Sequence, residues 1–217
     1  MSELQKRIFS SIIIIPLSLF IIVKGSILFL FFLIFCFLLS CYEWNKMAKG
    51  KIINLLGLIF LLISFYSAFS IREELEDNSL FIFLFLIIIS VSTDIGGYIF
   101  GKIFKGPKLT KISPNKTYAG VIGSFLTSVL FGILFINYFK NIYYYKVDVS
   151  NNFILLILFL SFVSQIGDLI VSYFKRISKL DNTGKLIPGH GGILDRIDGI
   201  IFVVPTFYIL NYFFIIL

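Results

Sequence analysis

Charged residues are scarce in this chain of 217 residues, of which only 14% are Asp, Glu, Lys or Arg. Soluble domains carry about 25% charged residues. Hydrophobic residues make up 58% of the chain and fall into long runs, which excludes an ordinary soluble globular protein. The composition therefore predicts an all-α fold, that of a polytopic integral membrane protein.

Cysteine and histidine are also nearly absent. The two cysteines, Cys36 and Cys41, lie in or at the end of an apolar run, and His190 is the one histidine. Without a second Cys or His pair nearby, zinc is disfavoured, and a packing role is favoured for both thiols over a disulfide or a metal pair. The formal net charge of +7 is better explained by membrane topology than by nucleic acid, and we expect no nucleic-acid partner.

Seven apolar runs, most of them near the roughly 20 residues that cross a bilayer, predict about seven transmembrane helices. They cover approximately residues 8–23, 26–42, 53–70, 79–100, 120–139, 153–174 and 199–217. The first run is short and is expected to form a tight hairpin with the second. No small-residue cleavage site follows it, so we interpret it as a retained span.

The expected organisation is one membrane-embedded domain over residues 1–217. Its N-terminal helices cover about 8–100, a motif-rich catalytic part covers about 94–199, and the final span covers 199–217.

With the N-terminus in the cytoplasm, four of the 19 Lys and Arg residues fall on the other side, namely Lys24, Arg72, Lys140 and Lys146. The positive-inside rule thus predicts a cytoplasmic N-terminus and places both polar loops on the cytoplasmic face of the cell (inner) membrane.

Two small residues and two polar residues share one face at the end of the fourth span. Asp94, Gly97, Tyr98 and Gly101 recur at three- and four-residue intervals. Gly97 and Gly101 predict a close approach of another helix. Asp94 is either a site residue or a helix-end residue solvated at the interface.

The loop after the fourth span gathers hydroxyl, amide and ammonium side chains at Ser113, Asn115, Lys116 and Thr117. Such a group suits an anion-binding turn, with Lys116 as a donor to phosphate. A basic loop that only sets topology and binds anionic lipid headgroups explains the pattern equally well.

The sixth span carries a polar stripe with helical spacing, formed by Ser161, Gln165, Asp168, Ser172 and Lys175. An Asp at mid-membrane costs at least about 2.5 kcal/mol, so such residues usually face a cavity or mark a site. The alternative is an ion pair of Asp168 with Lys175 or Arg196 that holds helices together.

A Gly- and Pro-rich loop follows the sixth span, and His190 lies within it, where it is either a donor to phosphate or an ordinary loop residue. Asp195 and Asp198 are three residues apart, so a helix beginning near Leu194 projects both from one face. Arg196 points elsewhere and is available for a phosphate. Converging carboxylates among basic residues suit Mg²⁺, and a second cation is left open.

Three segments resemble the motifs of the phosphatidate cytidylyltransferase (CDP-diacylglycerol synthase) family. They are Asp94 with ISPNKT at 112–117, GDL at 167–169, and SYFKR at 172–176 followed by GKLIPGHGGILDRID at 184–198. The resemblance implies an all-helical integral membrane enzyme, usually a homodimer. It implies that the enzyme makes CDP-diacylglycerol and pyrophosphate from CTP and phosphatidate with Mg²⁺.

The resemblance, together with the residue patterns, assigns the site. Catalytic roles are expected for Asp168, Lys175, Arg176, His190, Asp195, Arg196 and Asp198. Substrate-binding roles are expected for Asp94, Ser113, Asn115, Lys116, Thr117, Ser172, Gly191 and Gly192, and metal-binding roles for Asp168, Asp195 and Asp198. The chain departs from the family pattern at Ala119, Val171 and Asp181-Asn182, where acidic positions are altered, and we assign no role there.

Two other functions compete with this one. A CTP-dependent lipid or polyprenol kinase would direct attack to the γ-phosphorus and release CDP. An ion-coupled transporter with Asp168 in its path is less favoured, because interrupted mid-membrane helices and repeated halves are not visible.

Overall fold

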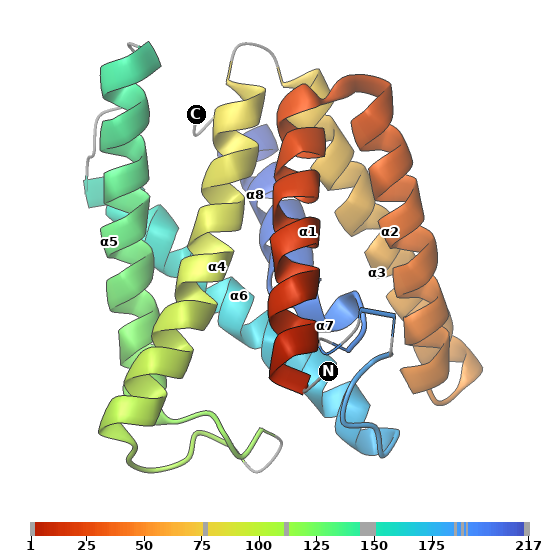
Figure 1. Cartoon of the computed structure of the whole chain (residues 1–217). Helices are drawn as coiled ribbons and strands as arrows, with labels where there is room; N and C mark the ends of the chain where they lie inside the picture. The colour runs from red at the N-terminus through yellow and green to blue at the C-terminus, as the bar shows by residue number, and fades with distance from the viewer. Residues whose placement is uncertain are drawn as a thin grey trace. The chain divides into compact units, whose positions relative to one another are not determined.

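The computed structural model describes residues 3–75, 78–110, 113–143, 151–184, 186–187, 189 and 191–214. Within these residues the regular elements are all helical (Figure 1). They are α1 (Glu3–Lys24), α2 (Ser26–Met47), α3 (Lys51–Phe69), the π-helix η1 (Ser70–Glu74), α4 (Ser79–Phe104), α5 (Tyr118–Tyr143), α6 (Asn151–Ile177), α7 (Leu194–Ile197) and α8 (Ile200–Phe214).

The described residues confirm an all-α polytopic membrane protein. Six helices, α1 to α6, are long and apolar enough to cross a membrane. The predicted final span corresponds to α8, which is apolar but shorter, with 15 residues in the described part of the chain. The first helix is longer than its apolar run suggested, because the polar residues from Glu3 onward continue it by more than a turn.

The chain divides into two compact units. The first unit comprises Met1–Leu80 and Tyr173–Asp198, and the second comprises Phe81–Ser172 and Gly199–Leu217. Each unit therefore combines early helices with a later segment of the chain. The sequence predicts that the whole chain forms one domain. Whether the two units join into one domain stays a prediction.

A tight hairpin joins α1 and α2 in the first unit, as predicted. Gly25 alone links the helices, with a φ of 65° in the region that favours glycine. Arg72 of η1 donates to the carbonyls of Ile22 (2.8 Å) and Val23 (3.0 Å), which end α1. Glu73 accepts the N–H of Ser26 at 2.9 Å, which begins α2. These two side chains thus satisfy backbone groups that helix ends leave unpaired.

The end of α2 holds the end of α6, also within the first unit. The Trp44 ring packs edge-on against Phe174, with ring centroids 4.8 Å apart. Lys49 donates to the last carbonyl of α6, Ile177, at 2.8 Å, and the Ser178 hydroxyl donates to the Met47 carbonyl. The segment that leaves α6 is therefore fixed to α2 before it enters the Gly-rich loop.

Close packing of α4 on α5 organises the second unit (Figure 1). A Cβ on Gly120 would lie 2.8 Å from the Gly97 carbonyl, and one on Gly101 would lie 3.7 Å from the Gly120 Cα. The Ser124 hydroxyl donates to the Thr93 carbonyl at 2.7 Å. The predicted close helix approach at Gly97 and Gly101 is confirmed, and it brings together the two helices that flank the 105–117 loop.

Candidate active site

The loop between α4 and α5 is a hairpin-like turn in the second unit. Lys108 and Thr117 form an isolated antiparallel bridge, and the Leu109 N–H donates to the Lys116 carbonyl at 2.9 Å. The Thr117 hydroxyl accepts the Gly120 N–H at 3.1 Å, so Thr117 is the N-cap of α5. The structure gives this residue a folding role beside the substrate-binding role predicted for it.

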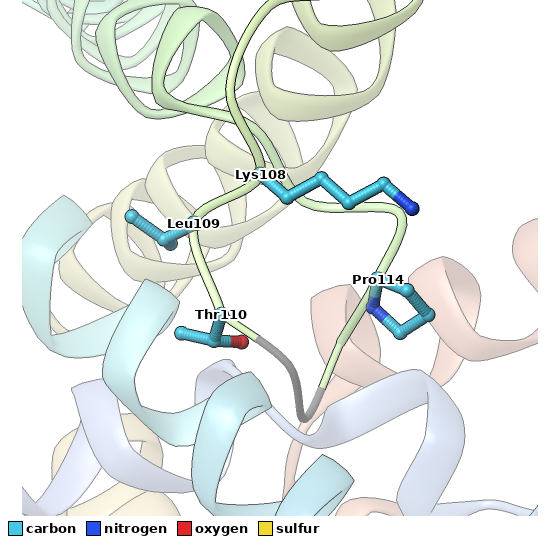
Figure 2. A pocket seen from close by; sticks show the side chains of 4 residues that line it. All are labelled: Lys108, Leu109, Thr110 and Pro114. Atoms are coloured by element: carbon cyan, nitrogen blue, oxygen red, sulfur yellow. The ribbon is translucent and has the colours of Figure 1, made fainter.

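A pocket of about 420 Å³ lies against this loop, lined by Lys108, Leu109, Thr110 and Pro114 (Figure 2). Leu109 and Thr110 lie on one arm of the loop and Pro114 on the other, while the Lys108 side chain extends across toward the second arm. Its volume is within the range of small-ligand pockets. The predicted residues Ser113 and Asn115 flank Pro114, so the pocket adjoins the predicted substrate-binding turn.

Three of the predicted site residues, Lys116, Asp168 and Ser172, meet in the second unit. Lys116 forms an ion pair with Asp168 of α6, with 2.7 Å between Nζ and Oδ2, and both side chains are 24% exposed. Ser172, one turn further along α6, donates to Asp168 Oδ1 at 3.2 Å. Asp168 thus pairs with Lys116, a partner that the sequence analysis did not name.

A second pair of predicted site residues, Lys175 and Asp195, lies in the first unit. Lys175 Nζ is 2.8 Å from Asp195 Oδ1, and the two side chains are 12% and 6% exposed. Asp195 Oδ2 accepts the N–H groups of Thr183 (2.8 Å) and Gly192 (3.0 Å) and lies 3.0 Å from the Thr183 hydroxyl. Burial alone would raise the pKa of Asp195, but the hydrogen bonds and the Lys175 charge outweigh burial and hold this pKa below its usual value.

Glu43 of α2 completes this group, and the predicted site did not include it. Its side chain is fully buried. Oε2 accepts the Thr183 hydroxyl at 2.7 Å and the Leu194 N–H at 2.9 Å, while Oε1 accepts the Ile193 N–H at 2.9 Å. A carboxylate directly after the apolar run at 26–42 was the signal that could have identified it, because ionisable residues in membrane helices are usually functional.

The Gly-rich loop forms a tight turn in the first unit. Ile187 and Gly191 exchange backbone hydrogen bonds of 2.9 and 3.2 Å, and Gly191 has a φ of 91°. Arg7 at the start of α1 donates to the Gly189 carbonyl at 2.7 Å. Gly191 is thus required by the turn itself. His190 lies outside the described residues, so its predicted role stays a prediction.

The remaining predicted residues occupy varied positions. Asp94 is exposed on α4, and Arg196 is exposed on α7, which begins at Leu194 as expected. Arg176 forms an ion pair of 2.8 Å with Asp181, whose side chain is 94% exposed. Asp198 is buried, with 8% exposure. Among the described residues, no three His, Cys, Asp or Glu side chains form a group that could hold a metal ion.

Comparison with known proteins places these motifs in a family. A sequence model of the Cytidylyltransferase family matches residues 51–214. The chain is 33% identical to the phosphatidate cytidylyltransferase of Rickettsia conorii, over 97% of this chain and 92% of that protein. It is 38% identical to the protein of that name from Rickettsia prowazekii, over 94% and 90% of the two chains. For Brucella suis the identity is 30%, over 99% and 95%.

The fold, the paired Lys and Asp residues and these matches together define a membrane-embedded nucleotidyltransferase. The chain belongs to the cytidylyltransferase family.

Proposed function

We propose that this protein transfers CMP from CTP to phosphatidate, giving CDP-diacylglycerol and pyrophosphate for phospholipid synthesis. The observation that carries the proposal is the similarity to phosphatidate cytidylyltransferases over nearly the full length of both chains. The two Lys–Asp pairs within the matched segment support it, because the reaction joins two anionic substrates that repel each other.

The reaction needs positioning and charge stabilisation more than covalent chemistry. A phosphate oxygen of phosphatidate attacks the α-phosphorus of CTP in line. The new P–O bond forms as the bond between the α- and β-phosphates breaks, and pyrophosphate leaves with that electron pair. No general base is required, because the attacking phosphate is already ionised.

Lys116 and Lys175 are the proposed phosphate-binding groups. Each ammonium carries three N–H donors. In the described contacts one donor of Lys175 goes to Asp195, and Lys116 is paired with Asp168. The aspartates fix the ammonium groups in place, and the remaining donors serve phosphate oxygens. Arg176 and Arg196, both exposed, extend the basic surface for the second anion.

Mg²⁺ is part of the proposal on chemical grounds, because it prefers carboxylate oxygens and substrate phosphates, and Asp168, Asp195 and Asp198 are the carboxylates proposed for it. Among the described residues these three do not form one metal-binding group. At Asp195, Oδ2 accepts the N–H groups of Thr183 and Gly192, so Oδ1 is the atom available to a cation, in competition with Lys175. When bound, Mg²⁺ would neutralise charge on the CTP phosphates.

The proposal also includes the setting of the reaction. The active site faces the cytoplasm, where CTP is available, at the cell (inner) membrane, and two copies of the chain form a homodimer. The Lys and Arg distribution supports the orientation. The acyl chains of phosphatidate then approach from the bilayer.

The test uses the purified full chain in detergent micelles with cytosine-labelled CTP and Mg²⁺. We expect label to enter the organic phase with phosphatidate and not with diacylglycerol or a polyprenol. Label that enters with diacylglycerol or a polyprenol but not with phosphatidate would contradict the proposal and favour transfer of CMP to another acceptor. A lipid kinase would bring no cytosine label into the organic phase, because the cytosine stays in water-soluble CDP. No lipid label with any acceptor would refute it.

A further inference from the structure

A buried polar cluster in the first unit connects α2 to the Lys175–Asp195 ion pair. It consists of Glu43, Thr183, Lys175, Asp195 and the backbone N–H groups of residues 192–194. Glu43 is fully buried and Thr183 is 2% exposed. Glu43 lies in the candidate membrane span Ser26–Met47, where a carboxylate is costly and is usually functional.

We propose that Glu43 is a positioning residue, which through Thr183 and the 192–194 backbone holds the Lys175–Asp195 pair in the geometry that binds the anionic substrates. The inference rests on the proposed function for the role of Lys175. It adds a residue from α2, outside the segment 51–214 that the family model matches.

The first step is the Thr183 hydroxyl, which faces two carboxylates. Its oxygen lies 2.7 Å from Glu43 Oε2 and 3.0 Å from Asp195 Oδ2. A hydroxyl has one proton, and a carboxylate oxygen accepts but does not donate. The shorter distance assigns that proton to Glu43. Glu43 therefore fixes the orientation of Thr183 beside Asp195.

The second step is the backbone. Glu43 binds the Thr183 hydroxyl and the N–H groups of Ile193 and Leu194. Asp195 binds the N–H groups of Thr183 and Gly192, which belong to the same two segments. Glu43 thus sets the separation of the two segments that supply the donors to Asp195, and Asp195 in turn holds the Lys175 ammonium.

The third step is the space left for this carboxylate. A Cβ on Gly192 would lie 2.4 and 2.5 Å from the two Glu43 oxygens, and one on Gly184 would lie 2.6 Å from Oε1. All three distances are below real Cβ contacts, so a side chain at either position would displace the Glu43 carboxylate from its present place. Neither glycine has a positive φ among the described residues, so space, not backbone conformation, explains them.

The test compares Thr183→Val, which removes the hydroxyl at nearly constant volume, with Thr183→Ser, which keeps it. Thr206→Val is the matched control, because Thr206 donates only to the Phe202 carbonyl of its own helix in the printed contacts of the structure. We expect Thr183→Val to lower kcat/KM about 10- to 100-fold, as loss of outer supporting contacts does. Thr183→Ser should stay within about threefold of the wild type, by the same reasoning.

Two further measurements separate positioning from general loosening. In a Lys175→Gln background, Thr183→Val should have no further effect, because the residue it positions is already gone. In the otherwise wild-type chain, an amine-reactive reagent should modify Lys175 faster in Thr183→Val and in Glu43→Gln, while Lys49 is modified at an unchanged rate.

An undiminished kcat/KM in Thr183→Val, or an equal loss in the Lys175→Gln background, would overturn the proposal. So would unchanged Lys175 labelling. Labelling needs no turnover, so it also tests the positioning if the wild type makes no CDP-lipid, a result that refutes the proposed function alone.

Discussion

A single added methyl group at Gly192 should disable the enzyme. The Cβ of Gly192→Ala would lie 2.0 Å from the Thr183 hydroxyl oxygen, besides its clashes with Glu43. Ordinary contact requires about 3.4 Å, so the hydroxyl must retreat by roughly 1.4 Å, which takes a hydrogen bond of normal length out of range. A displacement of about 1 Å near reacting groups can cost about 100-fold in rate. We therefore expect about a 100-fold loss of kcat/KM.

The assay is the initial rate of CDP-lipid formation in micelles at varied CTP, with thermal unfolding measured in parallel. Gly50→Ala is the control, because Gly50 also lies in a turn but a Cβ there meets nothing within 4 Å. Its φ of 101° disfavours alanine, so we expect a stability loss of about 1 kcal/mol with little change in rate. A Gly192→Ala enzyme within about threefold of the wild type would refute the reasoning on space, since the expected loss is far larger.

Three other predictions concern Asp195, Arg72 and topology. Asp195 stabilises the fold above the ordinary aspartate pKa, and this stabilisation is lost as the pH falls through the lowered pKa of Asp195 in the folded protein. Because Lys175 helps to lower that pKa, Lys175→Met should move acid unfolding, measured by fluorescence, to higher pH. An unchanged unfolding pH would contradict this. Arg72→Met should lower the free energy of unfolding by about 2 kcal/mol, because it removes two charged hydrogen bonds to carbonyls of α1, and it should leave kcat/KM unchanged. The control Lys24→Met should change neither the free energy of unfolding nor kcat/KM. In a Cys36→Ser, Cys41→Ser background, Lys179→Cys should be labelled only from the cytoplasmic side and Lys24→Cys only from the other; the reverse pattern would refute the orientation.

Much of the fold follows from local patterns. Apolar runs located the six long helices, and the Gly97 and Gly101 spacing predicted the close packing on α5, because these features depend on neighbouring residues alone. The start of α7 at Leu194 followed from the Asp195 and Asp198 spacing for the same reason. The predicted final span corresponds to α8, which is described from Ile200 to Phe214.

The contacts within the site were less predictable. Helical spacing shows which residues share a face with Asp168, but not which loop lies opposite, so Lys116 was not foreseen as its partner. Glu43 and Thr183 are 140 residues apart, and tertiary packing of α2 against the end of α6 and against α7 brings them together. Thr117 has a hydroxyl that suits both a phosphate and a helix N-cap, and the sequence does not distinguish the two uses.

The most direct test of the central proposal is the fate of the CTP phosphates. The full chain is incubated with phosphatidate and with CTP labelled either at the α- or at the γ-phosphate. Cytidylyl transfer predicts that α-label enters the lipid, that γ-label leaves as pyrophosphate, and that the two products form in equal amounts. Entry of γ-label into the lipid, with release of CDP, would contradict it.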